Sequence, residues 1–138
     1  MRELKFRFID TGDGTVYLPI TLKELLPRIE LPRRVILESE NGDFIDTDDF
    51  LDLLENGELI AEQYTGLKDK NGKEIYEGDI VSGHNPYYIG TFEIAWREDK
   101  AGWFGFAKDD YTWPLYNMEH PKVIGNIHEN PELLEVQE

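Results

Sequence analysis

Residues 64–81 read YTGLKDKNGKEIYEGDIV, and this stretch decides the fold because it places two turns between apolar strand residues. Asn71-Gly72 is typical of a type I′ hairpin turn, in which both central residues have positive φ. Glu77-Gly78-Asp79 is typical of a second tight turn. We therefore predict a sheet around these turns, filled by Leu67, Ile75, Tyr76, Ile80 and Val81.

Further short strands follow this stretch. Residues 88–96 alternate with a period of two, which indicates a half-buried strand. We expect more strands at 103–107, 111–116 and 122–128, and Gly125 inside the last of them indicates a bulge or a close backbone approach. Strands at this spacing predict a small β-barrel, with an SH3-like form as one candidate.

The residues before the stretch predict an α+β region. Leu4, Phe6 and Phe8 alternate with charged residues as in a strand, and Thr21 is placed to cap a short helix through Glu24. Asn41-Gly42 predicts another type I′ hairpin, between the apolar run 35–37 and Phe44. The fold class is therefore mainly β, α+β overall, with residues 1–60 packed on residues 61–138 or forming one continuous domain with them.

An acidic helix is predicted over residues 47–55. Thr47 is a suitable N-cap, and Asn56-Gly57 is a suitable left-handed stop. The expected buried stripe is Phe50, Leu51, Leu53 and Leu54. Residues 38–58 contain nine acidic residues and no basic one, so the outer face of the helix is acidic. A solvated face explains this pattern, and a docking face for a partner is the alternative, with Asp48, Asp49, Asp52 and Glu55 as candidate contacts.

Composition restricts the partners. The chain has 138 residues, no cysteine and a formal charge of −15. A field of this sign repels nucleic acid and anionic membranes and attracts basic surfaces. No apolar run approaches the roughly 20 residues that span a bilayer, and no segment has signal-peptide character. We expect a soluble protein of the cytoplasm that uses no disulfide and contacts no membrane.

No motif for catalysis or for a cofactor stands out. The three histidines, His84, His120 and His128, have no zinc-ligand spacing, and no glycine-rich loop precedes a Lys-Ser or Lys-Thr pair. Paired carboxylates are too common in this chain to single out one acid–base pair. We expect no catalytic residue, no metal and no cofactor, and a carboxylate or metal-dependent hydrolase remains an open alternative.

Aromatic residues are dense between residues 87 and 116. Rings on strands can stack single-stranded bases, but such sites also need basic residues, and this stretch offers only Arg97, Lys100 and Lys108. We expect core packing to account for most of the rings. Exposed ones such as Trp103 are candidate contacts for a protein partner, and binding of single-stranded nucleic acid is the alternative.

Three blocks of the chain resemble the YopX family in the same order: residues 2–7, residues 64–81 and residues 123–134. Phe8-Ile9-Asp10 departs from the Ala-Trp-Asp usual in that family, and residues 14–59 show no pattern of it. The resemblance implies a protein encoded by a phage or prophage and made in a bacterial cytoplasm. It implies no activity and no catalytic residue.

The leading hypothesis is therefore a non-enzymatic accessory protein that binds another protein, host-encoded or its own copy. A more specific version is an acidic decoy that mimics DNA toward a host DNA-binding protein, motivated by the charge of −15. The hydrolase and the nucleic-acid binder stay open beside it.

Overall fold

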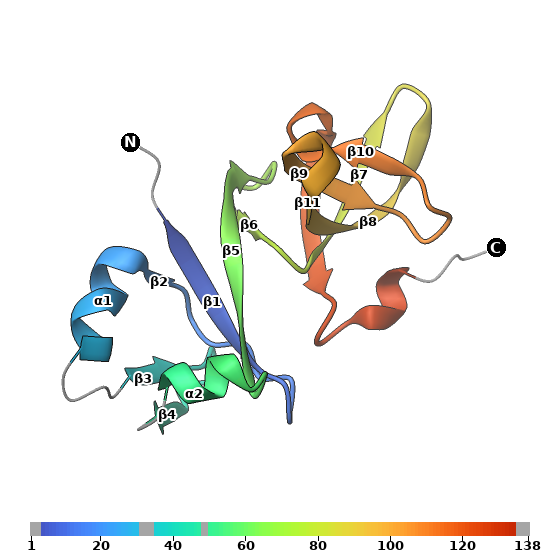
Figure 1. The fold of residues 1–138 in the computed structure, drawn as a ribbon. Coiled ribbons are helices and arrows are strands. Elements are labelled where there is room, and N and C mark those ends of the chain that lie inside the picture. Colours follow the sequence, from blue (N-terminus) through green and yellow to red (C-terminus); the bar gives the residue numbers. More distant parts are fainter. Residues whose placement is uncertain (1–3, 31–34, 48–49, 135–138) are drawn as a thin grey trace. The chain divides into compact units, whose positions relative to one another are not determined.

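The computed structural model describes residues 4–30, 35–47 and 50–134 (Figure 1). Two compact units make up the chain, residues Met1–Tyr64 (unit 1) and residues Thr65–Glu138 (unit 2). Strands dominate the described residues of both units, which confirms the prediction of a mainly β protein.

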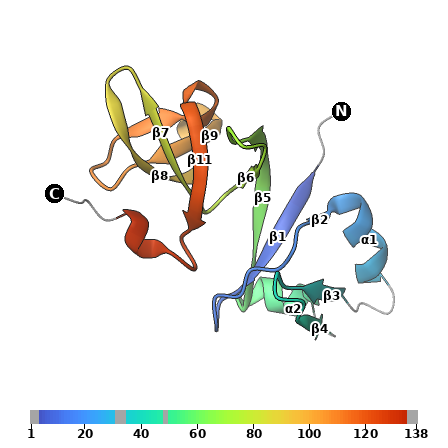
Figure 2. The ribbon, with the colours of Figure 1, turned by 180° about the vertical axis from the view of Figure 1, so that it is seen from behind.

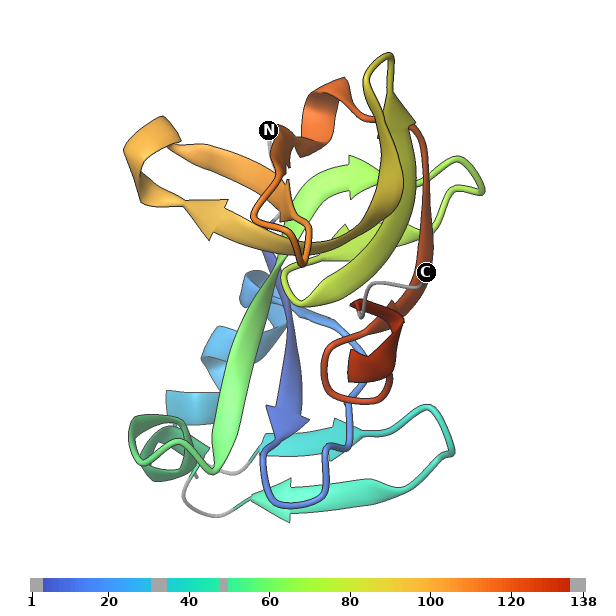
Figure 3. The same ribbon diagram turned by 90° about the vertical axis from the view of Figure 1, so that its right-hand side faces the viewer.

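Strand β1 (Lys5–Asp10) is the centre of the sheet in unit 1. It pairs antiparallel with β2 (Ile20–Thr21) on one side and with the first half of β5 (Leu59–Lys68) on the other. Figure 3 shows β1 and β5 running side by side. A single core packs between this sheet, the helices and a second hairpin: Phe8, Tyr17, Ile20, Leu25, Val35, Leu37, Phe50 and Leu59.

Helix α1 (Leu22–Glu30) begins at the predicted cap. The Thr21 N–H donates to Glu24 Oε1 at 3.1 Å, and the Glu24 N–H donates to Thr21 Oγ1 at 3.1 Å. This reciprocal pair is a capping box, which satisfies two backbone donors that the first helical turn leaves without partners. The box therefore fixes where the chain changes from β2 to α1.

Strands β3 (Val35–Glu38) and β4 (Phe44–Thr47) form the predicted second hairpin. Side chains alternate between the two faces of a strand, so Val35 and Leu37 share one face and Ile36 and Glu38 share the other. Val35 and Leu37 are buried in the core, whereas Ile36 and Phe44 are exposed. Phe44 lies directly opposite Glu38, which places it on the exposed face of the hairpin.

Helix α2 (Phe50–Glu55) is shorter than the helix predicted over 47–55, because Thr47 is the last residue of β4. Phe50 is buried and Leu53 and Leu54 pack against the core, as predicted. The prediction for Leu51 is wrong, since its side chain is 52% exposed. Leu53 and Leu54 lie three and four residues after Phe50 and share its face, whereas Leu51 is rotated by about 100° from Phe50 and lies off the centre of that face.

The prediction of type I′ turns is wrong at both Asn-Gly pairs. Positive φ falls on Gly42 and Gly72 alone within these turns, so each loop is a type I turn followed by a left-handed glycine. The reason is the residue at the first turn position. Ser39 Oγ accepts the Asp43 N–H, and Asp69 Oδ1 accepts the N–H groups of Asn71 and Lys73 (2.9 Å each).

In unit 2, the second half of β5 forms a hairpin with β6 (Glu74–Tyr76), and a five-stranded sheet follows. That sheet has the order β10-β9-β8-β7-β11, and Figure 2 shows its strands β7, β8, β9 and β11. Between its strands lie the short helices η1 (Glu98–Lys100) and η2 (Leu115–Asn117), with η3 (Pro131–Leu134) after the last strand. The strands are β7 (Asp79–Asn85), β8 (Tyr88–Arg97), β9 (Gly102–Phe106), β10 (Thr112–Pro114) and β11 (Glu119–Asn126).

Closure of this sheet into a barrel stays a prediction. Strand β10 is one edge and β11 the other, and within the described ranges no pairing joins the two. The core of unit 2 lies against this sheet and consists of Ile75, Val81, Phe92, Ile94, Ala107, Leu115 and Met118.

Gly125 marks a bulge, which confirms that part of its predicted role, and its close neighbour is a side chain, not a second backbone. The register between β11 and β7 shifts between Val123 and Gly125. A Cβ at position 125 would lie 2.5 Å from Asn130 Oδ1, a distance that no side chain tolerates. The Asn130 amide therefore occupies the space that a larger residue at 125 would need.

Candidate functional site

The predicted contact residues fall into three groups. Asp52 and Glu55 lie on the exposed side of α2, opposite buried Phe50, so they are accessible as predicted. Asp48 and Asp49 lie outside the described residues. Trp103 is on β9 in unit 2, whereas the acidic helix α2 belongs to unit 1.

Trp103 is half-buried, less exposed than expected, and its role as a contact for a partner stays a prediction. Its side chain packs against the core of unit 2, and its indole N–H is buried with no hydrogen-bond partner among the described residues. It pairs across the strands with Trp96, and the two rings meet edge to face with centroids 5.2 Å apart. Such pairing explains its burial, because aromatic pairs stabilise each other beyond their buried area.

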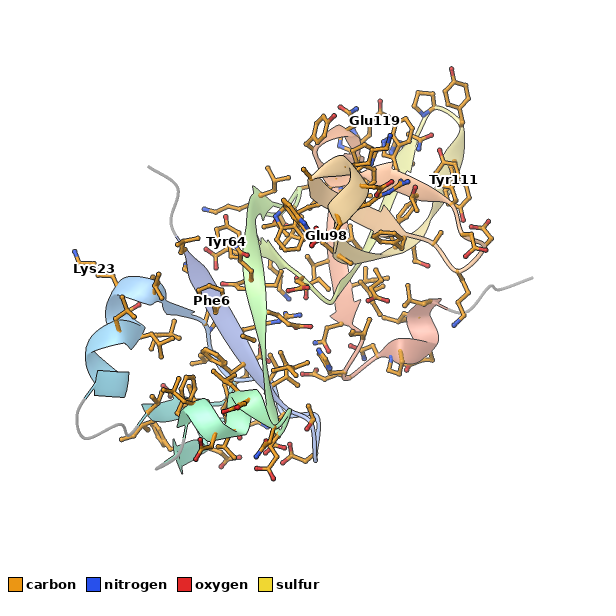
Figure 4. The ribbon with its side chains drawn as sticks, in the orientation of Figure 1. Phe6, Lys23, Tyr64, Glu98, Tyr111 and Glu119 are labelled. Atoms are coloured by element: carbon orange, nitrogen blue, oxygen red, sulfur yellow. The ribbon has the colours of Figure 1, made fainter. Side chains whose placement is uncertain are left out.

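Core packing explains most of the aromatic residues between 87 and 116, as predicted. Tyr88 and Tyr111 stack in parallel with centroids 4.2 Å apart, and Trp113 lies next to Tyr111 (6.4 Å). Figure 4 shows Tyr111 beside the β7–β8 hairpin. The Asn85 amide donates to the Tyr111 hydroxyl at 3.0 Å. These three rings stack on one another, which occupies ring faces that a nucleic-acid base would need for stacking.

The Tyr88 hydroxyl lies 3.2 Å from Asp109 Oδ2. Partial burial raises the pKa of Tyr88, and its hydrogen bond to Asp109 and the charge of that carboxylate raise it further. The phenol therefore stays protonated and acts as a donor to Asp109. This contact holds the loop before β10 against β8, which is a structural role.

Two histidines that are distant in sequence lie together in unit 2. His84 Nδ1 is 3.3 Å from Glu119 Oε2, and the His84 and His120 rings are 5.7 Å apart. Pairing of β7 with β11 produces this cluster, which spacing along the sequence did not indicate. Across the described residues of the chain, no three ligand side chains are arranged to hold a metal ion.

A groove in unit 1 is a concave feature that sequence reasoning missed. Its volume is about 580 Å³. It runs between the segment leading through β2 into α1 and the exposed face of the β3–β4 hairpin. Its lining residues are Leu18, Pro19, Ile20, Glu24, Ile36, Leu37, Glu38 and Phe44.

Large apolar side chains of the groove face solvent. Phe44 is 68% exposed, Ile36 is 52% exposed and Leu18 is 40% exposed. Isolated exposed apolar residues are ordinary on protein surfaces, but a cluster that lines one concavity marks an interaction site. The sequence signal for it was Ile36 and Phe44, two apolar residues at positions where the alternation of the hairpin calls for polar ones.

Two sets of hydrogen bonds fix the walls of the groove. The Leu18 N–H donates to the Glu38 carbonyl at 2.6 Å and joins the two walls at one end. The capping box fixes Glu24 at the other wall, where its carboxylate also accepts the Thr21 hydroxyl at 2.8 Å. Both carboxylates of the lining are therefore attached to rigid elements. The nearest basic residue in sequence, Lys23, extends outward from α1 (Figure 4).

The groove is thus apolar in its walls and acidic in its charge. Glu24 and Glu38 line it, and Glu40 and Asp43 are exposed on the same hairpin. Like charges this close attract cations and basic side chains from solution. No described helix is both long enough and apolar enough to cross a bilayer.

The chain was compared with known proteins. The model of the YopX protein family matches residues 30–135. A crystal structure of protein EF1440 from Enterococcus faecalis is similar, with 29% identity and a TM-score of 0.54 over 96% of this chain and 98% of the other. The crystal structure of protein yopX from Bacillus subtilis has 18% identity and a TM-score of 0.46 over 95% and 98%. No curated protein matches the chain.

The family match confirms the resemblance to the family and covers two of the three sequence blocks, residues 64–81 and 123–134. It also covers residues 30–59, in which the sequence alone showed no family pattern. It spans nearly all of unit 2, including the whole five-stranded sheet, and the second half of unit 1, including the β3–β4 hairpin and α2. With this share of its length matched, the chain belongs to the YopX protein family.

Proposed function

We propose that this chain is a non-enzymatic protein-binding module that captures a partner protein in the groove of unit 1. The observation that carries the proposal is the cluster of exposed apolar side chains, Leu18, Ile36 and Phe44, inside a concavity with an acidic lining. Interaction sites combine an apolar centre with a polar rim in this way. The setting we propose is that of a phage or prophage accessory protein in a bacterial cytoplasm.

The chemistry of the groove favours binding over catalysis. Glu24 accepts hydrogen bonds from both the N–H and the hydroxyl of Thr21, so its carboxylate serves as a helix cap. A hydrolase needs two acids with different protonation states around a substrate. Glu38 is the other carboxylate of the lining, and its residue is exposed to solvent, so the groove holds no pair of acids in contrasting surroundings.

Affinity capture from lysate of a bacterial host tests the proposal. Tagged wild-type protein is compared with Phe44→Ser, which removes the most exposed apolar ring of the groove. The matched control is Tyr87→Ser, which removes a ring that is 87% exposed in unit 2, away from the groove lining. We expect a partner that wild type and Tyr87→Ser retain and Phe44→Ser loses. Equal retention by all three variants would exclude the groove as the binding site.

The acidic face of α2 is a second surface to be tested in the same experiment. Charge reversal of Asp52 and Glu55 alters exposed residues only, so the fold is preserved. A decoy that mimics DNA predicts that DNA competes with this chain for the partner and that moderate salt releases it. An apolar groove contact predicts a partner that persists at moderate salt and is unaffected by DNA.

A further inference from the structure

One wall of the groove is the edge of strand β3. The Glu38 carbonyl points off the hairpin, because it accepts the Leu18 N–H at 2.6 Å. The next residue faces the other way, since the Ser39 N–H donates to the Asp43 carbonyl at 2.8 Å, across the turn of the same hairpin. Backbone groups of successive strand residues point to alternate sides in an antiparallel ladder.

This alternation determines which way the backbone N–H and carbonyl of Ile36 point. It lies two residues before Glu38, so its N–H and carbonyl point to the same side as those of Glu38, away from β4 and toward the groove. In the described ranges, neither group has a hydrogen-bond partner on that side. Pro19 stands on the lining of the groove and has no N–H to offer the Ile36 carbonyl. The groove therefore contains a short open strand edge.

An open edge of this kind is a template for another strand. Strand addition uses main-chain hydrogen bonds for affinity, and alternate side chains of the added strand enter pockets for specificity. Ile36 lies on this edge, and Phe44 of β4 lines the same groove, so both exposed side chains offer such contacts to apolar residues.

Charge decides which strand fits. Glu24 and Glu38 line the groove, Glu40 and Asp43 are exposed on the same hairpin, and the stretch 38–58 contains nine acidic residues and no basic one. A second copy of this chain carries a net charge of −15 itself and is repelled. A segment that alternates apolar residues with Lys or Arg complements both the apolar side chains of the groove and its negative charge.

We propose that the groove binds an extended basic-apolar segment of a partner protein as an added strand on the Ile36 edge of β3. The apolar side chains of that segment enter the groove, and its Lys and Arg side chains lie against Glu24 and Glu38. This inference rests on the proposed function and specifies the partner that the same groove accepts.

The test uses the full chain as bait for a display library of random nine-residue peptides. We expect the enriched sequences to alternate apolar residues with Lys or Arg. The strongest peptide is then synthesised, and its dissociation constant is measured for the wild type, Ile36→Ala and Ile36→Pro. Both variants lose the isoleucine side chain, but only proline removes the N–H. Proline is tolerated at an edge position whose N–H has no ladder partner.

We expect Ile36→Pro to bind the peptide at least tenfold more weakly than Ile36→Ala, while both unfold at similar temperatures. Leu37→Pro is the reverse control. Its N–H faces β4, so this variant is expected to lose the hairpin. N-methylation of the peptide is a second measurement that needs no folded variant. Methyl groups on one alternate set of amides should weaken binding at least tenfold, and the other set should have little effect.

The outcomes distinguish strand addition on β3 from the broader claim that the groove is the binding site. Equal binding by Ile36→Pro and Ile36→Ala, or indifference to N-methylation at every position, overturns strand addition. The groove itself stands in that case if Phe44→Ser still abolishes binding. Enriched peptides without Lys or Arg overturn the charge assignment. A library that yields no binder, or only binders indifferent to Phe44→Ser, overturns the groove as a peptide site and the proposed function with it.

Discussion

The Asp69 carboxylate accepts a hydrogen bond from the Val123 N–H at 2.9 Å, across 54 residues of sequence. The same carboxylate accepts the N–H groups of Asn71 and Lys73 in its own turn. Asp69 therefore joins the β5–β6 turn to β11. It belongs to one of the sequence blocks that resemble the family, and Val123 begins another, so this bond gives a physical reason why the two blocks occur together.

Asp69→Asn should destabilise the protein. The amide keeps one acceptor oxygen but turns an NH₂ group toward a backbone N–H, which leaves buried donors without acceptors. Losses of this kind cost about 1–3 kcal/mol each. Chemical denaturation of the wild type and the variant at pH 7 measures the difference, and an unchanged unfolding free energy would contradict the role assigned to Asp69.

The same pair of proteins has a predicted pH dependence. Burial raises the pKa of Asp69, but the backbone hydrogen bonds from Val123, Lys73 and Asn71 and the charge of Lys73 outweigh it, so the pKa lies below its usual 3.8. A depressed pKa contributes stability above the pKa of the unfolded state and loses it as the pH falls through the lower folded value. The stability difference between wild type and Asp69→Asn should thus shrink below about pH 4. A constant difference down to pH 2 would refute the shift.

Breaking a buried ion pair in unit 1 should destabilise the protein more than breaking an exposed ion pair in unit 2. Arg7 Nη2 lies 2.8 Å from Glu62 Oε1, and both side chains are less than 10% exposed. Breaking such a pair costs about 3–5 kcal/mol, because it leaves an uncompensated buried charge. Glu62→Gln is therefore expected to lose about that much stability.

Asp99→Asn is the matched control for this prediction. It also removes one carboxylate charge opposite an arginine, but Asp99 is 62% exposed in its pair with Arg97. Exposed pairs contribute about 0–1 kcal/mol. Thermal and urea unfolding of both variants make the comparison, and equal losses would contradict the burial argument.

Asp110 occupies the position in its hairpin loop that glycine occupies in the other two. The Ala107–Tyr111 loop has the hydrogen bonds of the Ser39–Asp43 and Asp69–Lys73 loops, and Asp110 has a φ of 71°. A side chain in this left-handed region costs about 1 kcal/mol relative to glycine. Asp110→Gly should therefore be more stable than Asp110→Ala by about 1 kcal/mol.

Lys108, two residues earlier in the same loop, provides the control because its φ is not positive. There the order reverses, since glycine adds conformational entropy to the unfolded chain, and Lys108→Gly should be less stable than Lys108→Ala. Urea denaturation of the four variants measures these stability differences. If alanine and glycine rank in the same order of stability at both positions, the positive φ of Asp110 is not the cause of the difference.

Gly125→Ala should destabilise unit 2 by about 1–3 kcal/mol, as overpacking does in other cores. The clash is with the Asn130 side chain, so Asn130→Ala in the same protein should restore some of the loss. A double-mutant cycle measures this coupling. Additive effects of the two substitutions would mean that the strain at 125 comes from the backbone and not from Asn130.

Local patterns were enough to predict much of the fold. The capping box at Thr21 and Glu24, the bulge at Gly125 and the strands of unit 2 depend on neighbours in sequence, where propensity and period are informative. The turn type at Asn41 and Asn71 failed because the side chains of Ser39 and Asp69 stabilise a different loop. The prediction for Leu51 failed because neighbouring apolar residues in so short a helix allow more than one buried face, and packing of Phe50 into the core decides which face it is.

The candidate site was harder to predict. Exposure of one ring depends on its partner across the strands, as Trp103 and Trp96 show, and no local pattern contains that partner. The groove depends on Leu18 lying beside Glu38, a contact of residues 20 positions apart. Composition predicted the acidic character of residues 38–58, but only the register of β3 with β4 places Phe44 on the exposed face.

The most direct test is the dissociation constant of the captured partner, measured by calorimetry at low and moderate salt, for wild type, Phe44→Ser and Tyr87→Ser. Residues at the centre of an interface contribute more than about 1.4 kcal/mol, which is a factor of ten in affinity. We predict that Phe44→Ser binds at least tenfold more weakly at both salt concentrations and that Tyr87→Ser binds as wild type does. Equal affinities for wild type and Phe44→Ser would contradict the groove as the site of binding.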